Sequence, residues 1–258
     1  MPANAYPLIL YSNRFLDAVP TATDTATGYS VSNIRDLRPF TFHQFAALGT
    51  KYVYVNCGSA KSADTIAFIG HNFFTAAATI SVESSSSGAW AGEQVERLAG
   101  FTVTTDKAVL KVFATASAQW WRVKFVTAAV AAKFAVCILG VRLDFPRYPM
   151  GGFDPAPETL NAIAARSKFG YMIGATLQNI GIEIDVRFQS LTTSWIENSF
   201  RPAWDAHLSL CKPFFFAWDI TNHATEVYFV NLPGDFTLAM PFDPFRRSLS
   251  LTMEGIKE

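Results

Sequence analysis

Lys51-Tyr52-Val53-Tyr54-Val55-Asn56-Cys57 is an alternating stretch, rich in aromatic and β-branched residues, and it indicates the class of the fold. Residues of these kinds favour a pleated, half-buried strand. Segments of the same character recur through the first half of the chain, at Thr65–Ile69, Thr79–Glu83, Trp120–Phe125 and Phe134–Leu139. Turn formers separate them, at Gly58-Ser59, Gly70-His71-Asn72 and Ser84–Gly88. Short strands at this spacing, without amphipathic helices between them, predict an antiparallel β-sandwich over residues 1–145.

A proline- and glycine-rich segment interrupts this pattern. Phe145–Pro157 contains four prolines and two glycines in 13 residues. Proline fixes φ and removes a hydrogen-bond donor, so we expect a linker over residues 146–157. Beyond it, Gly181–Phe188 alternates apolar with charged residues, and further strands are expected at Pro213–Trp218, Glu226–Val230, Phe236–Leu238 and Ser248–Met253. The sequence predicts a second, separable β-domain over residues 158–258.

One helix is expected within this second domain, over residues 194–210. Ser194 and Glu197 have the spacing of a capping box, in which Ser194 caps the first turn. Pro202 lies inside the segment and is expected to kink or divide the helix. We expect one face of it to serve the core or the assembly of the protein, through Trp195, Ile196, Phe200, Trp204 and Leu208. The predicted fold class is therefore mainly β, a jelly-roll sandwich followed by a β-sandwich with one packed helix.

The composition excludes several classes of function. Lys and Arg number 21, and Asp and Glu also number 21, so charge alone does not hold this chain to nucleic acid or anionic lipid. Only 16% of the residues are charged, against about 25% in typical proteins, whereas 14% are aromatic. Cores of protein–protein interfaces share this bias, so we expect the chain to associate with protein partners.

Cysteine usage and the length of the apolar stretches predict the compartment of the protein and its relation to membranes. Three scattered cysteines predict neither a disulfide framework nor a zinc site and fit a reducing cytosol. The residues at the amino end lack the features of a signal peptide. The longest apolar stretch, Ala128–Val141, is far shorter than the ~20 residues of a membrane span. We therefore expect a soluble protein without membrane insertion.

Chemistry-bearing motifs are sparse. The four histidines form no HExxH or HxH pattern, so no metal or other cofactor is expected, and no nucleophile motif is present. Glu183 and Asp185 share the polar face of one strand, which predicts a solvated surface rather than a catalytic pair. No catalytic residue is assigned, and the expectation is that the chain is not an enzyme. A glycan hydrolase, which needs two carboxylates across a cleft, ranks last among the alternatives.

Three residues are candidates for contact with a glycan. Trp90 follows the serine–glycine segment, where its ring is placed to stack on a sugar face. His71 and Asn72 lie at the end of a predicted strand, where they support a loop or meet a ligand. Trp120 and Trp121 are adjacent in one strand, so one is expected in the core and the other at an edge or interface.

Several segments of the first half resemble discoidin-type, galactose-binding-like jelly rolls. The resemblance covers residues 6–145 and rests on Asn33–Thr41, Tyr52–Gly58, Ile66–Asn72, Trp121–Phe125 and Ile138–Gly140. A jelly roll with Gly70-His71-Asn72 is similar to the domains of this type in tail proteins of tailed bacteriophages. Where such domains have a D-x-G-like element, this chain has Asn56-Cys57-Gly58.

The second half is similar to tail-tip and baseplate proteins of long-tailed phages, including distal tail proteins. The resemblance rests on Leu191–Trp195, Phe200–Asp205, Lys212–Asp219 and Leu249–Gly255. It implies a tail-tube-like domain in a homo-oligomeric ring, hexameric first and trimeric as the alternative. The order of the domains is reversed relative to most distal tail proteins.

The resemblance also implies partners and location. The ring would join the tail tube to the host-recognition apparatus, contacting tube and hub proteins in the virion after synthesis in the bacterial cytoplasm. Genome DNA would only pass through its channel, whose lining is expected to include Glu183 and Asp185. The alternative from another functional class is a glycan-binding module that adheres to the host cell envelope.

Overall fold

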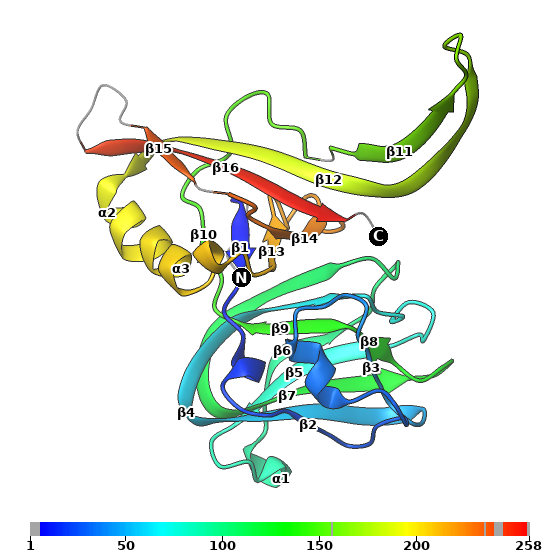
Figure 1. The fold of residues 1–258 in the computed structure, drawn as a ribbon. Helices are drawn as coiled ribbons and strands as arrows, with labels where there is room; N and C mark the ends of the chain where they lie inside the picture. Colours follow the sequence, from blue (N-terminus) through cyan, green and yellow to red (C-terminus); the bar gives the residue numbers. More distant parts are fainter. Residues whose placement is uncertain (1–5, 156, 235, 240–244, 257–258) are drawn as a thin grey trace.

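The computed structural model describes residues 6–155, 157–234, 236–239 and 245–256, and the fold is mainly β with several antiparallel sheets (Figure 1). The strands of the first half are β1 (Leu8–Leu10), β2 (Thr21–Ala22), β3 (His43–Gln44), β4 (Gly49–Ile69), β5 (Thr79–Ser85), β6 (Val95–Phe101), β7 (Val109–Thr127), β8 (Lys133–Phe134), β9 (Val136–Gly140) and β10 (Leu143–Asp144). Short helical turns lie between them at Arg14–Leu16, Val31–Arg35 and α1 (Trp90–Glu93). Each segment predicted as a strand in the first half lies in a strand, except that Phe134–Leu139 is divided between β8 and β9.

Most of these strands form a six-stranded sheet in the order β2-β4-β7-β5-β6, with β9 also paired to β4. A small sheet of β3 and β8 lies apart from it. Side chains that alternate inward along β7 are buried, as at Trp121, Val123 and Phe125. They meet a cluster of phenylalanines in the sandwich core, which consists of Phe45, Phe68, Phe73, Phe125 and Phe134. The high phenylalanine content is thus used largely in the core.

β4 is one strand where the sequence predicted two. Gly58-Ser59, expected as a turn, lies within it. The pairing with β7 shifts register between Asn56 and Lys61, and Gly58 has a φ of +72°. A register shift with a glycine at positive φ bends a strand without ending it. β4 therefore curves around the sandwich (Figure 1).

The second half forms most of an eight-stranded sheet, which also includes β1, from the amino end of the chain, and the edge strand β10. Its order is β10-β1-β13-β14-β16-β12-β11, and β15 pairs with β16. The additional strands are β11 (Thr159–Arg166), β12 (Met172–Thr192), β13 (Phe214–Ala217), β14 (Val227–Asn231), β15 (Thr237–Ala239) and β16 (Arg246–Ile256). Leu8–Leu10, which the sequence assigned to the first unit, is thus a strand of the second sheet.

β1 is buried on both faces and joins the two units. Ile9 points into the core of the second unit, whereas Leu8 and Leu10 point toward the jelly roll. There they share one apolar cluster with residues of both units, including Ile69, Leu110, Ile138, Phe215 and Val227. A shared apolar core argues against the separable folds that the proline-rich segment suggested, because separation would expose it to water.

The predicted helix is present as a series of helical turns. They are α2 (Thr193–Trp195), a π-helical turn (Ile196–Phe200), α3 (Arg201–Ala206) and a 3-10 turn (Leu208–Leu210). Thr192, and not Ser194, caps the start, since its hydroxyl accepts the Trp195 N–H at 3.3 Å. Pro202 lies in the first turn of α3, directly after the π turn, where a missing N–H is tolerated.

The expected apolar face of these turns packs on the second sheet. Ile196, Phe200 and Leu208 are buried in the core of that unit. Trp195 and Trp204 are only partly buried, and Trp204 packs against Phe236 with ring centroids 4.4 Å apart. All five residues therefore pack within the chain, and a role of the partly buried Trp195 and Trp204 in assembly stays a prediction.

β11 and the first part of β12 form a hairpin that projects from the body of the molecule (Figure 1). No strand was predicted from the sequence between Pro157 and Gly181. The turn at its tip is ordered by hydrogen bonds from the Ser167 N–H to the Tyr171 carbonyl and from the Gly170 N–H to the Ser167 carbonyl. The residues on both faces of this arm are exposed.

Candidate functional site

Three neighbouring strands place an aromatic and charged cluster on the outer face of the jelly roll. Tyr54 on β4 lies opposite Arg122 on β7, and Arg122 lies opposite Glu83 on β5. Tyr52, two residues before Tyr54, projects from the same face because strand side chains alternate. The core-facing neighbours, Val53 and Val55, are buried on the other face.

Arg122 is the centre of this cluster. Its guanidinium lies between two rings, 4.3 Å from the centroid of Tyr52 and 4.1 Å from that of Trp90. Its Nε donates to Glu83 Oε2 at 2.5 Å, and its Nη2 donates to Gln94 Oε1 at 2.6 Å. The side chains of Arg122 and Glu83 are each 7% exposed, so the ion pair is covered although it lies on the outer face. Buried charge-assisted bonds hold such a group in one position.

Trp90 is brought to this cluster by the serine-rich loop. Its ring is half-buried and lies 5.8 Å from that of Tyr54. Glu93 orders the loop, because its carboxylate accepts hydrogen bonds from the hydroxyls of Ser85, Ser86 and Ser87. These hydrogen bonds lower the pKa of the Glu93 carboxyl, and the bond from the Ser87 hydroxyl has the largest effect. The loop is therefore organised around an ionised carboxylate.

A polar hollow is lined by residues of this loop and of neighbouring strands. It has a volume of about 290 Å³. Ser84, Glu93, Arg97 and Gln119 line it, among others. Arg97 Nε donates to the Ser84 hydroxyl at 2.8 Å, and Gln119 donates to Asn56 at 3.2 Å. This end of the sandwich thus combines half-exposed rings with fixed hydrogen-bonding groups.

His71 and Asn72, the other candidates for glycan contact, serve the fold instead. His71 is buried and stacks on Phe73 with ring centroids 4.3 Å apart, and burial lowers its pKa to about 4. The Asn72 side chain accepts the Lys133 N–H at 2.7 Å and donates to the Ala131 carbonyl at 3.1 Å. They precede β5, whereas Trp90 follows it, so the structure does not bring the three candidates together.

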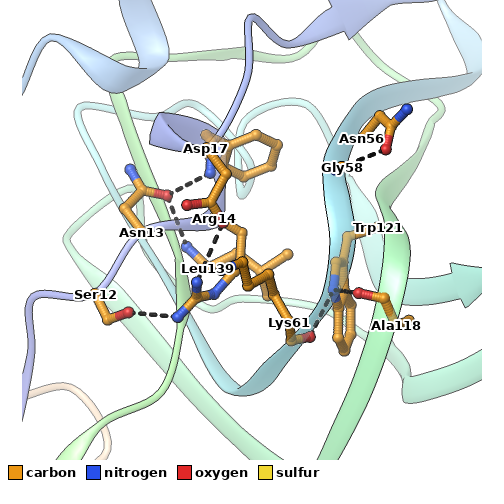
Figure 2. A network of polar contacts seen from close by, with 11 residues as sticks. Ser12, Asn13, Arg14, Asp17, Asn56, Gly58, Lys61, Ala118, Trp121 and Leu139 are labelled. Carbon is orange, nitrogen blue, oxygen red and sulfur yellow. Dashed lines mark hydrogen bonds and ion pairs between the residues drawn. The ribbon is translucent and has the colours of Figure 1, made fainter.

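The segment after β1 is held against β9 by a polar network (Figure 2). Asn13 Oδ1 accepts the N–H groups of Phe15 and Leu139 at 3.0 and 3.4 Å, and its Nδ2 donates to the Cys137 carbonyl at 3.2 Å. Arg14 donates to the Ser12 hydroxyl at 2.7 Å and to Asp17 at 3.1 Å. These contacts fix the path of the chain from β1 into the jelly roll, and none of them involves the Arg122 cluster.

The motif residues of the discoidin resemblance are also structural. Thr41 donates to Asp36 Oδ2 at 2.7 Å, and the Asn33 amide donates to the Phe42 carbonyl at 2.8 Å. Together they close the loop around Val31–Arg35. Trp121 is buried and Trp120 is half-exposed on the outer face, as the expectation of opposite faces requires.

Sequence reasoning identified Trp90 but missed Tyr52, Tyr54, Arg122 and Glu83. Tyr52 and Tyr54 are two residues apart in one strand, and Trp120 and Arg122 are two residues apart in another. Each pair therefore lies on one face of its strand, which is the signal that could have identified these residues. Pairing register places these faces beside each other, and register was not readable from either strand alone.

Within the described ranges, no group of three or more His, Cys, Asp or Glu side chains is arranged to hold a metal ion. In that part of the chain, no helix is long and apolar enough to cross a membrane. Cys57 and Cys137 are buried free thiols, and Cys211 is exposed. The Arg122 cluster is the candidate that combines half-exposed rings with polar groups held in place by hydrogen bonds.

No protein-family model matches the chain, and no curated protein matches it. Solved structures of similar shape include chitosan-binding module 1 of a chitosanase/glucanase from Paenibacillus sp. IK-5, with 18% identity, a TM-score of 0.42 and coverage of 50% of this chain and 98% of that one. Module 2 of the same enzyme, in complex with chitotriose, has 18% identity, a TM-score of 0.43 and coverage of 50% and 99%. A module from Clostridium perfringens in complex with GalNAc-β-1,3-galactose has 10% identity, a TM-score of 0.42 and the same coverage.

Proposed function

We propose that this chain is a carbohydrate-binding protein whose site is the cluster of Tyr52, Tyr54, Trp90, Arg122 and Gln94. The observation that carries the proposal is the position of Arg122 between the rings of Tyr52 and Trp90, fixed by Glu83 and Gln94. Such bracing holds half-exposed rings in place before a ligand arrives. Preorganised aromatic surface lowers the entropy lost on binding.

The chemistry of the cluster fits a sugar ring. The apolar face of a pyranose packs on an aromatic ring, as Trp90 and Tyr54 offer, while its hydroxyls bond to polar groups at the rim. Gln94 is exposed and carries both donor and acceptor groups. The charge of Arg122 is balanced by Glu83, so the site favours a neutral sugar. The proposal assigns no catalytic step to the chain.

A glycan array with the full chain, followed by calorimetry on the sugars that bind, tests this function. Trp90→Ala is expected to abolish binding, because it removes one stacking surface and uncovers Arg122. Phe74→Ala is the matched control, since Phe74 is an exposed aromatic residue that precedes β5. Wild-type binding by the Trp90 variant, or equal loss in the control, would reject the site. A wild-type protein without affinity for any sugar would reject the function.

A second candidate function is a structural subunit of a phage tail tip, in the virion, in contact with tube and hub proteins. The projecting hairpin of β11 and β12 favours it, because an exposed apolar arm suits a protein that works in an assembly. The hexameric or trimeric ring belongs to this proposal. A reconstruction of the virion is expected to show copies of this chain as a ring around the tail axis. If the chain is absent from the particle, this candidate function is rejected.

A further inference from the structure

The arm of residues 159–181 is exposed over almost its whole length. Its exposed large apolar side chains include Leu160, Ile163, Phe169, Tyr171, Met172, Ile173 and Leu177, with Phe169 84% exposed. A two-stranded hairpin alone is marginally stable in water. An exposed apolar edge strand such as β11 also invites pairing with other chains. These properties indicate that another molecule covers the arm.

The tip of the arm is basic. Arg166 and Lys168 are the only charged residues between Thr159 and Gly181, and both are exposed. Arg166 also donates to the Gly170 carbonyl at 3.3 Å, which keeps its side chain at the turn. A surface that receives the tip must therefore supply negative charge.

An acidic surface lies at the base of the same sheet, with three carboxylates and one exposed arginine, Arg187, which offsets one of their charges. Glu183 on β12 pairs directly across from Glu254 on β16, and Asp185 follows on the same face. All three are exposed. Like charges directly opposite each other weaken a pair of strands. Within the described residues neither glutamate forms an ion pair, so a cationic partner would relieve this repulsion.

The tip cannot reach this surface within one molecule. Glu183 and the tip both belong to the β11–β12 hairpin, separated by 13 residues from Gly170. An extended strand of that length spans roughly 40 Å. The acidic face of a second copy is the complementary surface that the chain itself provides.

We propose that the basic tip of the β11–β12 arm docks on the Glu183, Asp185 and Glu254 face of another copy of this chain. The contact joins two different surfaces, so it is heterologous, and repeated contacts close into a ring or extend as a filament. This inference goes beyond carbohydrate binding, and it holds wherever the assembled protein is located.

Charge reversal in the full-length protein tests the contact by sedimentation velocity over a range of concentrations. Arg166→Glu with Lys168→Glu, and separately Glu183→Lys with Glu254→Lys, are each expected to weaken self-association by about tenfold or more. All four positions are exposed, and circular dichroism checks that the fold is kept. Arg38→Glu with Lys61→Glu makes the same change of charge on exposed residues of the jelly roll and should leave self-association unchanged.

Mixing the two variants separates this contact from general electrostatic effects. In an equimolar mixture, each tip meets a complementary face only on the other variant, so assembly should return with alternating copies. A wild-type protein that stays monomeric, reversals without effect, or a mixture that fails to assemble would each overturn the proposal. Glycan binding is measured on the same samples and should be unchanged in both variants, so the two proposals fail independently.

Discussion

Ile9 pairs with Phe216 in an antiparallel ladder, so a strand from the start of the chain completes a sheet built from its end. The neighbours of Ile9, Leu8 and Leu10, point to the opposite face and enter the apolar cluster shared with the jelly roll. One three-residue strand therefore contributes to the cores of both units. This arrangement couples their stabilities.

Ile9→Ala is expected to destabilise the whole chain, by about 2–5 kcal/mol, because Ile9 is fully buried. Urea unfolding should remain a single transition when tryptophan fluorescence is compared with far-ultraviolet circular dichroism. Leu16→Ala, at an exposed position close in sequence, is the control. Two separate transitions in the variant would show that the units fold independently.

Gly140→Ala tests how closely the segment after β1 approaches β9. A Cβ atom at position 140 would lie 1.9 Å from the Ser12 carbonyl oxygen, which belongs to the main chain and has little room to move. Overpacking of this kind costs about 1–3 kcal/mol or more. Gly151→Ala, where a Cβ meets nothing within 4 Å, should have a much smaller effect in the same thermal melts.

Removing one partner of the Glu83–Arg122 ion pair should lower the free energy of unfolding much more than replacing both partners. Glu83→Gln leaves a buried guanidinium without its counter-charge, for which a loss of about 3–5 kcal/mol is expected. Glu83→Gln combined with Arg122→Met removes the charge and keeps a long side chain between Tyr52 and Trp90, so much of the stability should return. Equal stability of the double and single variants would contradict this account of the pair.

Acid should destabilise the protein through His71. Burial, the dominant cause, lowers its folded pKa from 6.5 to about 4, so between these values the unfolded chain binds a proton that the folded chain does not. Stability therefore falls as the pH drops through this window, by at most about 3 kcal/mol from this group. His71→Phe keeps the ring stacked on Phe73 and should flatten the dependence measured by urea unfolding. Burial also lowers the pKa of His43 and His207, so part of the dependence should remain.

The helical turns after β12 provide a graded test of burial. Phe200 is fully buried, so Phe200→Ala is expected to cost about 3–5 kcal/mol. Trp204 is partly exposed and packs on Phe236 at the margin of this core, so Trp204→Ala should cost less, despite its larger side chain. Thermal unfolding of both variants gives the order. A larger loss of stability in Trp204→Ala than in Phe200→Ala would show that Trp204, and not Phe200, makes the main core contact of these turns.

The sequence by itself determined the class of fold and most of the strands. Alternation in Lys51–Cys57 and Gly181–Phe188 is a local property, and each strand shows it whichever strand it pairs with. The same locality identified the helical turns, because the apolar spacing of Ile196, Phe200 and Leu208 is independent of the surface they cover. It also placed Trp120 and Trp121 on opposite faces of one strand, although only the structure shows that Trp121 is the one in the core.

Only the tertiary structure decided which of these elements meet. The Arg122 cluster depends on the register of β4, β7 and β5, and β1 belongs to the second sheet through contacts distant in sequence. The arm at residues 159–181 was missed because its apolar residues face water on both sides and lack the alternation of a half-buried strand. An alternating pattern predicts that one face of a strand is buried within the chain. It predicts neither which strands pair nor which surface is left for another molecule.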